Sequence, residues 1–223
     1  MVLITLALVS LVVTACSSLI KKHPVPFYAL ALALDAVYLF FRFFASYSPL
    51  VLSALQVMQK GLIAYALFVV VMFIGALDES SRLRARLYPI RGELSLLGCL
   101  FVLGHVGGYL TSYLMTLLRD SGVIPPSVLA SILVSLASLV LLLVLGFTTF
   151  TFVRSRMNPT IWKRIQRLSY PFFGLIHVHL ALMLVPTMRN DAAGSALSLA
   201  VYAVVLIAYV FARLVRPRLK RAR

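Results

Sequence analysis

Apolar residues fill most of this chain in long runs that are separated by short polar connections. Seven runs are long enough to cross a membrane as helix, which takes about 20 residues. They cover residues 2–20, 26–45, 50–77, 93–117, 127–153, 165–187 and 196–215. The alternation typical of a membrane β-barrel is absent. The pattern therefore predicts an all-α fold, a polytopic membrane helix bundle with about seven transmembrane helices.

Composition supports this prediction and adds an orientation. The chain is 62% hydrophobic and 12% charged, which excludes a soluble globular domain. Of its 21 Lys and Arg residues, 17 fall on one side of the seven-helix arrangement. They are Lys21 and Lys22; Arg82, Arg84, Arg86 and Arg91; Arg154, Arg156, Lys163, Arg164 and Arg167; and those within 213–223. Because basic loops stay cytoplasmic, we expect the N-terminus outside and the C-terminus in the cytoplasm of a bacterial cell.

The net charge of +15 is thus explained by basic residues that set the orientation in the membrane and contact its lipid headgroups. No nucleic-acid partner is expected. Cys16 and Cys99 both lie inside apolar runs, without the spacing of a disulfide framework or of covalent haem attachment. The stretch 13–16 resembles a lipoprotein cleavage box. Lys21 and Lys22 follow the first run rather than precede it, which favours a retained helix. Lipidation of Cys16 stays open.

His105 and His179 each lie near the middle of an apolar run, where a histidine is costly unless something binds it. At about 1.5 Å of rise per residue, His105 lies about 18 Å along its helix from Glu93, and His179 about 21 Å along its own from Ile165. The two levels agree, on helices that run in the same direction. Imidazole is the commonest axial ligand of haem, so this pair predicts the two ligands of a haem b iron.

The residues around these histidines leave two alternatives open. Gly104 and Gly108 flank His105 and would let a flat cofactor lie against the backbone, but small residues serve helix–helix packing equally well. His177 and His179 are two positions apart and point about 200° from each other on a helix, so only one of them can face a given cofactor. Periodicity does not choose between the two, and His177 is an alternative ligand.

The stretch from Gly61 to His179 resembles the ferric-reductase-like transmembrane domain family. It is most similar to the YedZ-like membrane haem subunits of periplasmic methionine-sulfoxide reductase systems. The residues that carry the resemblance are Gly61; Arg91, followed fourteen positions later by His105 and then by Tyr109; and Trp162 to Tyr170, leading into His179. In this register the family's distal haem ligands fall on His105 and His179. Gln166 stands where the family has another histidine, and His177 matches nothing.

The resemblance implies a membrane b-type cytochrome with three parts. Residues 1–60 would be accessory helices, 61–187 the haem-binding core, and 188–223 the last helix with a basic tail. The substitution at Gln166 implies one haem rather than two, unless His177 or His23 compensates. The cytochrome would be an electron-transfer subunit of an oxidoreductase system, with no catalytic residues of its own.

The expected partners follow from the depth of the histidines. A haem at or beyond the midplane towards the outside is poorly placed for a cytosolic flavoprotein, so quinol is the favoured electron donor and a separate flavin reductase the alternative. An extracytoplasmic reductase or ferric iron would be the acceptor.

Two further polar residues, Asp35 and Lys60, interrupt the second and third runs at comparable depth. Isolated charges in a membrane are expensive, so an ion pair between the two is plausible. The pair would be structural, or part of a proton path or quinone contact. An alternative function follows from it: a cofactor-free transporter or membrane anchor with an Asp, Lys and His relay. A transporter is expected to have matched broken helices, which are not evident in this sequence.

Overall fold

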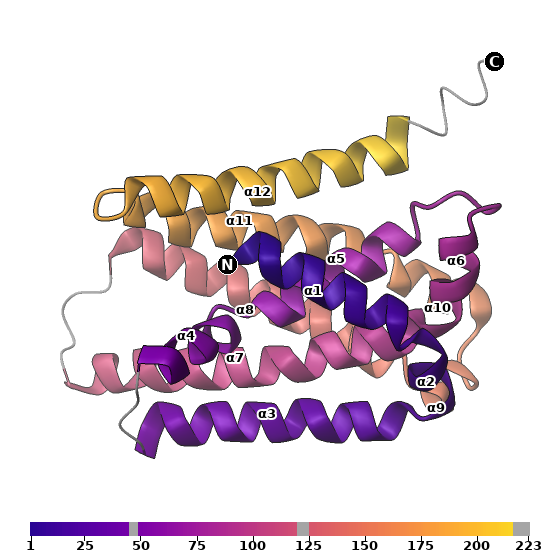
Figure 1. Ribbon diagram of the computed structural model, residues 1–223, viewed down its shortest axis with the longest axis horizontal. Coiled ribbons are helices and arrows are strands. Elements are labelled where there is room, and N and C mark those ends of the chain that lie inside the picture. The colour runs from indigo at the N-terminus through magenta and orange to yellow at the C-terminus, as the bar shows by residue number, and fades with distance from the viewer. Residues whose placement is uncertain (45–48, 120–124, 216–223) are drawn as a thin grey trace. The chain divides into compact units, whose positions relative to one another are not determined.

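The computed structural model describes residues 1–44, 49–119 and 125–215, and all secondary structure in these ranges is helical (Figure 1). The longer helices are α3 (Pro24–Phe44), α7 (Arg91–Arg119), α8 (Pro126–Phe147), α11 (Ser169–Thr187) and α12 (Ala192–Val210). The shorter ones are α1 (Val2–Ala15), α2 (Ser17–Lys22), α4 (Pro49–Gln59), α5 (Leu62–Ile74), α6 (Arg82–Leu87), α9 (Thr151–Arg154) and α10 (Pro159–Gln166).

The predicted membrane helix bundle is confirmed as a class. Within the described ranges, five helical segments are long and apolar enough to cross a membrane. They are Pro24–Phe44, Arg82–Tyr113, Pro126–Phe147, Pro159–Thr187 and Ala192–Leu214. The first and third predicted runs are also helical but broken, so that α1 has 14 residues and α5 has 13. The count of seven spans and the sides of the termini stay predictions.

The chain folds as two compact units, Met1–Val123 and Ile124–Arg223. The predicted boundaries at residues 60 and 187 divide the chain by expected function and not by which residues pack together. They stay predictions. In the first unit α5 is the most enclosed helix, since ten of its 13 residues are buried. It packs against α1 and α7, and α7 packs in turn against α3.

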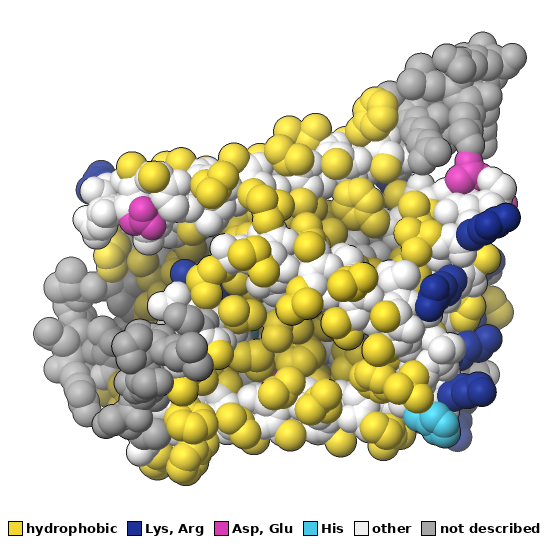
Figure 2. Space-filling view, viewed as in Figure 1, with side chains coloured by type: hydrophobic (Ala, Val, Ile, Leu, Met, Phe, Trp, Pro, Cys, Tyr) yellow, Lys and Arg dark blue, Asp and Glu magenta, His cyan; other side chains and the backbone are white. Residues whose placement is uncertain are grey.

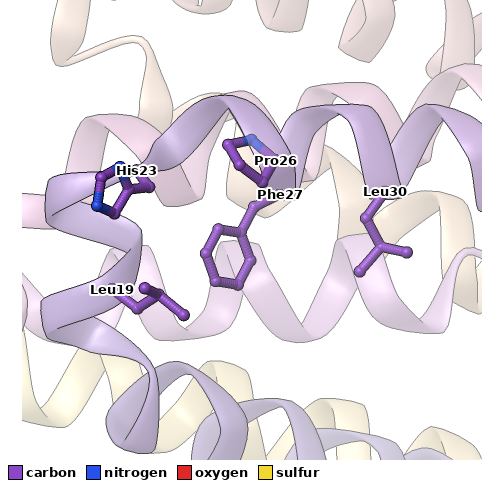
Figure 3. Close-up of a pocket in the computed structure, with 5 residues that line it drawn as sticks. All are labelled: Leu19, His23, Pro26, Phe27 and Leu30. Atoms are coloured by element: carbon purple, nitrogen blue, oxygen red, sulfur yellow. The ribbon is translucent and has the colours of Figure 1, made fainter.

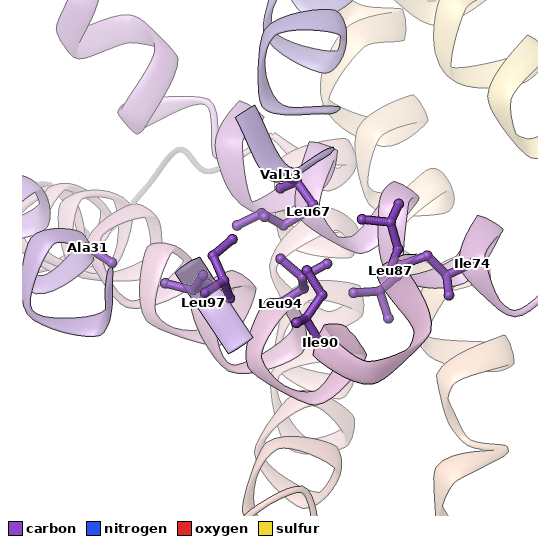
Figure 4. Packing of buried hydrophobic residues seen from close by; sticks show 10 residues of the cluster. Val13, Ala31, Leu67, Ile74, Leu87, Ile90, Leu94 and Leu97 are labelled. Atoms are coloured by element: carbon purple, nitrogen blue, oxygen red, sulfur yellow. The ribbon is translucent and has the colours of Figure 1, made fainter. Parts of the chain in front are cut away.

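The core of the first unit is a cluster of buried apolar side chains that α1, α2, α3, α5, α6 and α7 contribute together with the turn before α7 (Figure 4). Its buried apolar members are Val13, Ile20, Ala31, Leu67, Val71, Ile74, Leu87, Ile90, Leu94 and Leu97. Outside this core, apolar side chains cover the surface of α1 and α3, while Lys and Arg gather at the end formed by α2 and α6 (Figure 2). An apolar belt with a basic end is the surface expected of a membrane protein.

In the second unit α8 and α12 both pack against α11. The α8 helix is exposed on its Leu and Val side chains, at Leu129, Leu133, Leu136 and Val140 among others, and buried at Ser131 and Ser138. This inversion of the usual soluble pattern is typical of a helix that turns its apolar face to lipid and its small polar residues to a neighbouring helix.

Gly98 tests the contact between α5 and α7. A Cβ at this position would lie 2.7 Å from Cε1 of Phe68, so a Gly98→Ala substitution forces the ring to move. We expect a loss of about 1–3 kcal/mol in the free energy of unfolding, as for other overpacked sites. Titration with a denaturing detergent measures it. Gly174→Ala is the control, because a Cβ there meets nothing within 4 Å. A stability loss of equal size in both variants would contradict the tight contact.

Candidate functional site

The His105 side chain is held at the break between α4 and α5. Its Nδ1 lies 2.6 Å from the main-chain carbonyl oxygen of Gln59, the last residue of α4. The imidazole lies against Gly61, where a Cβ would come within 3.2 Å of Nδ1 and 3.3 Å of Cγ. Two residues from one short break therefore fix both the position and the orientation of this ring.

The break forms because Gly61 adopts the left-handed conformation, with φ of 63°. Residues with a Cβ adopt this region only at an energetic cost, whereas glycine adopts it without that cost. The turn ends α4 and begins α5, and it leaves the Gln59 carbonyl as one of the terminal acceptors that a helix cannot satisfy internally. In hydrocarbon such a group needs a partner from the protein, and the His105 ring supplies it.

This contact defines the tautomer of His105. A carbonyl oxygen can only accept, so Nδ1 carries the proton and donates it to Gln59. In the neutral ring Nε2 is then the nitrogen with the lone pair, which is the form that ligates a metal. The ring of Tyr109, one turn further along α7, lies with its centroid 5.1 Å from that of His105.

His179 is held in the same way by α8 of its own unit. Its Nδ1 lies 2.8 Å from Oγ of Ser131 and 2.8 Å from Oγ of Ser135. The Ser135 hydroxyl already donates its only hydrogen to the Ser131 carbonyl, at 2.8 Å. Towards the imidazole its oxygen can therefore accept from Nδ1, which leaves the lone pair on Nε2, whereas the Ser131 hydroxyl can donate to Nδ1 and give the other tautomer. In either case the two serines hold the ring through Nδ1.

These two serines, which lie in a helix made mostly of Leu, Val and Ala, were not singled out from the sequence. The available signal was the spacing of Ser131, Ser135 and Ser138, which recur every three to four positions in an otherwise apolar helix. Such a stripe marks the face that contacts a neighbour, and its hydroxyls bond across helices in a membrane. Which side chain they would meet depends on helix packing that the sequence alone does not specify.

His177 has a different environment from His179. It is 8% exposed, and its Nδ1 lies 2.8 Å from the Phe173 carbonyl oxygen of its own helix. Its ring packs edge-on against Phe173 of the same helix. The Phe173 ring in turn contacts the ring of Tyr209, which belongs to α12. The two histidines thus contact different neighbours, as their spacing on one helix predicts.

Gly104 and Gly108 bring α3 close to α7. A Cβ on Gly104 would collide with the Asp35 carboxyl group, and one on Gly108 with the Tyr38 hydroxyl. One Asp35 oxygen accepts from the Gly104 main-chain N–H at 3.2 Å. One turn beyond Gly108, Ser112 accepts from Arg42 at 3.0 Å. The glycines therefore act in helix packing here, and their role beside a cofactor stays a prediction.

The predicted ion pair between Asp35 and Lys60 is wrong. Asp35 is buried against α7 and bonded to Gly104, whereas Lys60 is exposed at the break that follows α4. The prediction compared depth along two helices, and depth does not tell which way each residue faces around its helix. Asp35 and Lys60 therefore do not form the ionic part of a relay in this structure.

Gln166, which stands where the family has a histidine, bonds to the end of α8. Its Nε2 donates to Oγ1 of Thr148 at 3.0 Å, and Nε1 of Trp162 donates to the Thr148 carbonyl at 2.9 Å. The Arg154 guanidinium lies 4.4 Å from the centre of the Trp162 ring. These contacts tie α10 to α8. His23, the other alternative ligand, is exposed at the corner between α2 and α3.

Over the described parts of the chain, no group of three or more His, Cys, Asp or Glu side chains could hold a bare metal ion. The fold defines a polytopic membrane protein in which His105 and His179 are each held through Nδ1 within their own unit. Residues 60–185 match the family model of the ferric reductase-like transmembrane component. The match covers more than half of the chain, which belongs to this family.

One relative is an uncharacterized protein of Treponema pallidum (strain Nichols), which is 33% identical over 156 residues. The aligned part is 70% of this chain and 43% of that protein, so the chain spans less than half of its relative's length. No solved structure matches. Family membership points to a membrane electron-transfer component, while the finer likeness to the YedZ-like subunits stays a prediction.

Gly61→Ala tests the hold on His105. The new Cβ is strained at this φ, by about 1–2 kcal/mol, and presses on the imidazole. We expect a protein that is less stable in detergent unfolding by about that amount. Gly107→Ala is the control, since a Cβ there meets Leu39 at an ordinary 3.6 Å. Equal stability of the two variants would show that the break does not need glycine.

Proposed function

We propose that this protein is a membrane b-type cytochrome that carries electrons through one haem b with His105 and His179 as axial ligands. The observation that supports this most is that each imidazole is held through Nδ1, by the Gln59 carbonyl in one case and by the Ser131 and Ser135 hydroxyls in the other, so that Nε2 would be the ligating nitrogen. This is the arrangement in which a second group fixes the tautomer and orientation of a ligating histidine.

The residues present fit such a cofactor. Two neutral imidazoles are a common axial pair, and a haem needs no further protein ligand to its iron. Held by His105 and His179, a haem b would supply a one-electron ferric/ferrous couple. The chain's own contribution is to hold the two rings, to exclude water with the apolar helices around them, and to set the potential through these contacts.

A single haem is proposed because Gln166 offers an amide where the family has a ligand. An amide side chain is a poor ligand for haem iron, and this one is bonded to Thr148. The glycines at 104 and 108 would serve the site indirectly, since the close approach of α3 that they permit fixes the segment of α7 that carries His105.

Electrons would come from quinol, or from a separate flavin reductase, and pass to an extracytoplasmic reductase or to ferric iron. The apolar surface and helix lengths support a multi-pass protein, and the Treponema relative supports a bacterial cell membrane. The electron donor and acceptor are proposals that rest on the expected depth of the haem.

Alanine variants of the four histidines test the ligand assignment. We expect His105→Ala and His179→Ala to lose the haem, because each removes an axial ligand, and His177→Ala and His23→Ala to keep it. The measurement is a dithionite-reduced minus oxidised absorption spectrum with haem quantified per chain. Loss in His177→Ala but not in His179→Ala would transfer the ligand role to His177. A wild-type protein without haem would refute the cytochrome.

Ser135→Ala tests the orientation of the second ligand. It removes one of the two hydroxyls at Nδ1 of His179, which should weaken haem binding by about 10-fold, at the lower end of the effect of other partners of ligating histidines. Ser138→Ala is a matched control, because the Ser138 hydroxyl bonds only to the Val134 carbonyl of the same helix. Haem titration of the apoprotein measures the difference. Equal affinities in the two variants would contradict the role of Ser135.

A further inference from the structure

A cleft of about 420 Å³ lies at the corner between α2 and α3 (Figure 3). Its walls are Leu19 and His23 from the α2 side and Pro26, Phe27 and Leu30 from α3. Figure 3 shows Phe27 and Leu30 projecting from α3 towards the side on which Leu19 lies. The volume falls within the roughly 300–1,000 Å³ of small-molecule sites, and the wall is apolar except for the imidazole.

The cleft follows from the local sequence. A residue that precedes proline is pushed out of the helical region, and His23 accordingly adopts φ of −137° and ψ of 71° before Pro24. The chain therefore turns between α2 and α3 within one residue. At such a turn the side chains of the two helices diverge, so the apolar surfaces of Leu19 and Phe27 are not closed over by the chain itself.

A rim of positive charge borders this apolar surface. Lys21 and Lys22 end α2, and both are exposed. Lys22 lies three positions after Leu19 and so shares its face of the helix, next to the cleft. Lys21 lies four positions after Ser17 on another face, where Nε of Arg86 donates to Oγ of Ser17 at 2.7 Å.

We propose that this cleft binds one anionic phospholipid. An acyl chain would lie against Leu19, Phe27 and Leu30, and the phosphate would bind the Lys22 ammonium and the N–H of the His23 ring. The combination favours a lipid over a quinone, since a neutral quinone head gains little from a cationic rim. A juxtamembrane lysine contributes about 1 kcal/mol of attraction to anionic lipid. The proposal does not depend on a haem.

Lipid retention by the purified full-length protein tests it. The protein is incubated in detergent with dioleoyl phosphatidylglycerol or with dioleoyl phosphatidylcholine, and bound lipids are counted by native mass spectrometry. We expect one phosphatidylglycerol per chain, with phosphatidylcholine retained less. Lys22→Gln should weaken the binding about fivefold, which corresponds to the attraction of one lysine. Lys21→Gln makes the same charge change on the other face and should have a smaller effect.

A second pair of variants tests the cleft itself. Leu30→Trp fills it and should abolish the retained lipid, whereas Leu32→Trp places the same ring on an exposed position of α3 outside the cleft. Equal weakening by Lys21→Gln and Lys22→Gln, equal retention of both lipids, or unchanged binding in Leu30→Trp would each overturn the proposal. So would displacement of the lipid by a short-chain quinone whose binding is insensitive to Lys22→Gln.

Discussion

The hydrogen bond from His105 to the Gln59 carbonyl is the contact on which the centre of the first unit depends. In hydrocarbon an unsatisfied main-chain carbonyl costs several kcal/mol, so a helix can break there only where the protein supplies a partner. The break at Lys60 and Gly61 creates such a carbonyl, and the imidazole satisfies it. The same bond stabilises an interrupted helix and determines which nitrogen of the ring keeps its lone pair.

The α7 helix combines three contacts along its length because several of its residues are small. Gly98 lets the Phe68 ring of α5 approach, Gly104 and Gly108 admit Asp35 and Tyr38 of α3, and His105 reaches the α4–α5 break. Packing of this kind replaces the hydrophobic effect inside a membrane, where lipid tails are as apolar as any side chain. The α7 helix, which carries the proposed ligand His105, is therefore held by direct contacts with both α3 and α5.

The sequence was sufficient for the class of fold and for the family, because apolar runs and motif spacing are properties of the chain itself. It was insufficient where an outcome depends on rotation about a helix axis. Asp35 and Lys60 share a depth but face different surroundings, and Ser131 and Ser135 meet His179 only through the packing of α8 on α11. The two helix breaks shortened α1 and α5 below the length that their apolar runs had predicted.

The acceptor that fixes His105 belongs to the main chain, and this has a consequence for how the protein can change over time. Any residue at position 59 offers the same carbonyl, so the contact places no demand on the side chain there and leaves no trace in a comparison of sequences. What must persist is the left-handed turn two positions later. The segment before the family-matched core, which begins at residue 60, is thus free to diverge around a contact that is invisible at the level of residue identity.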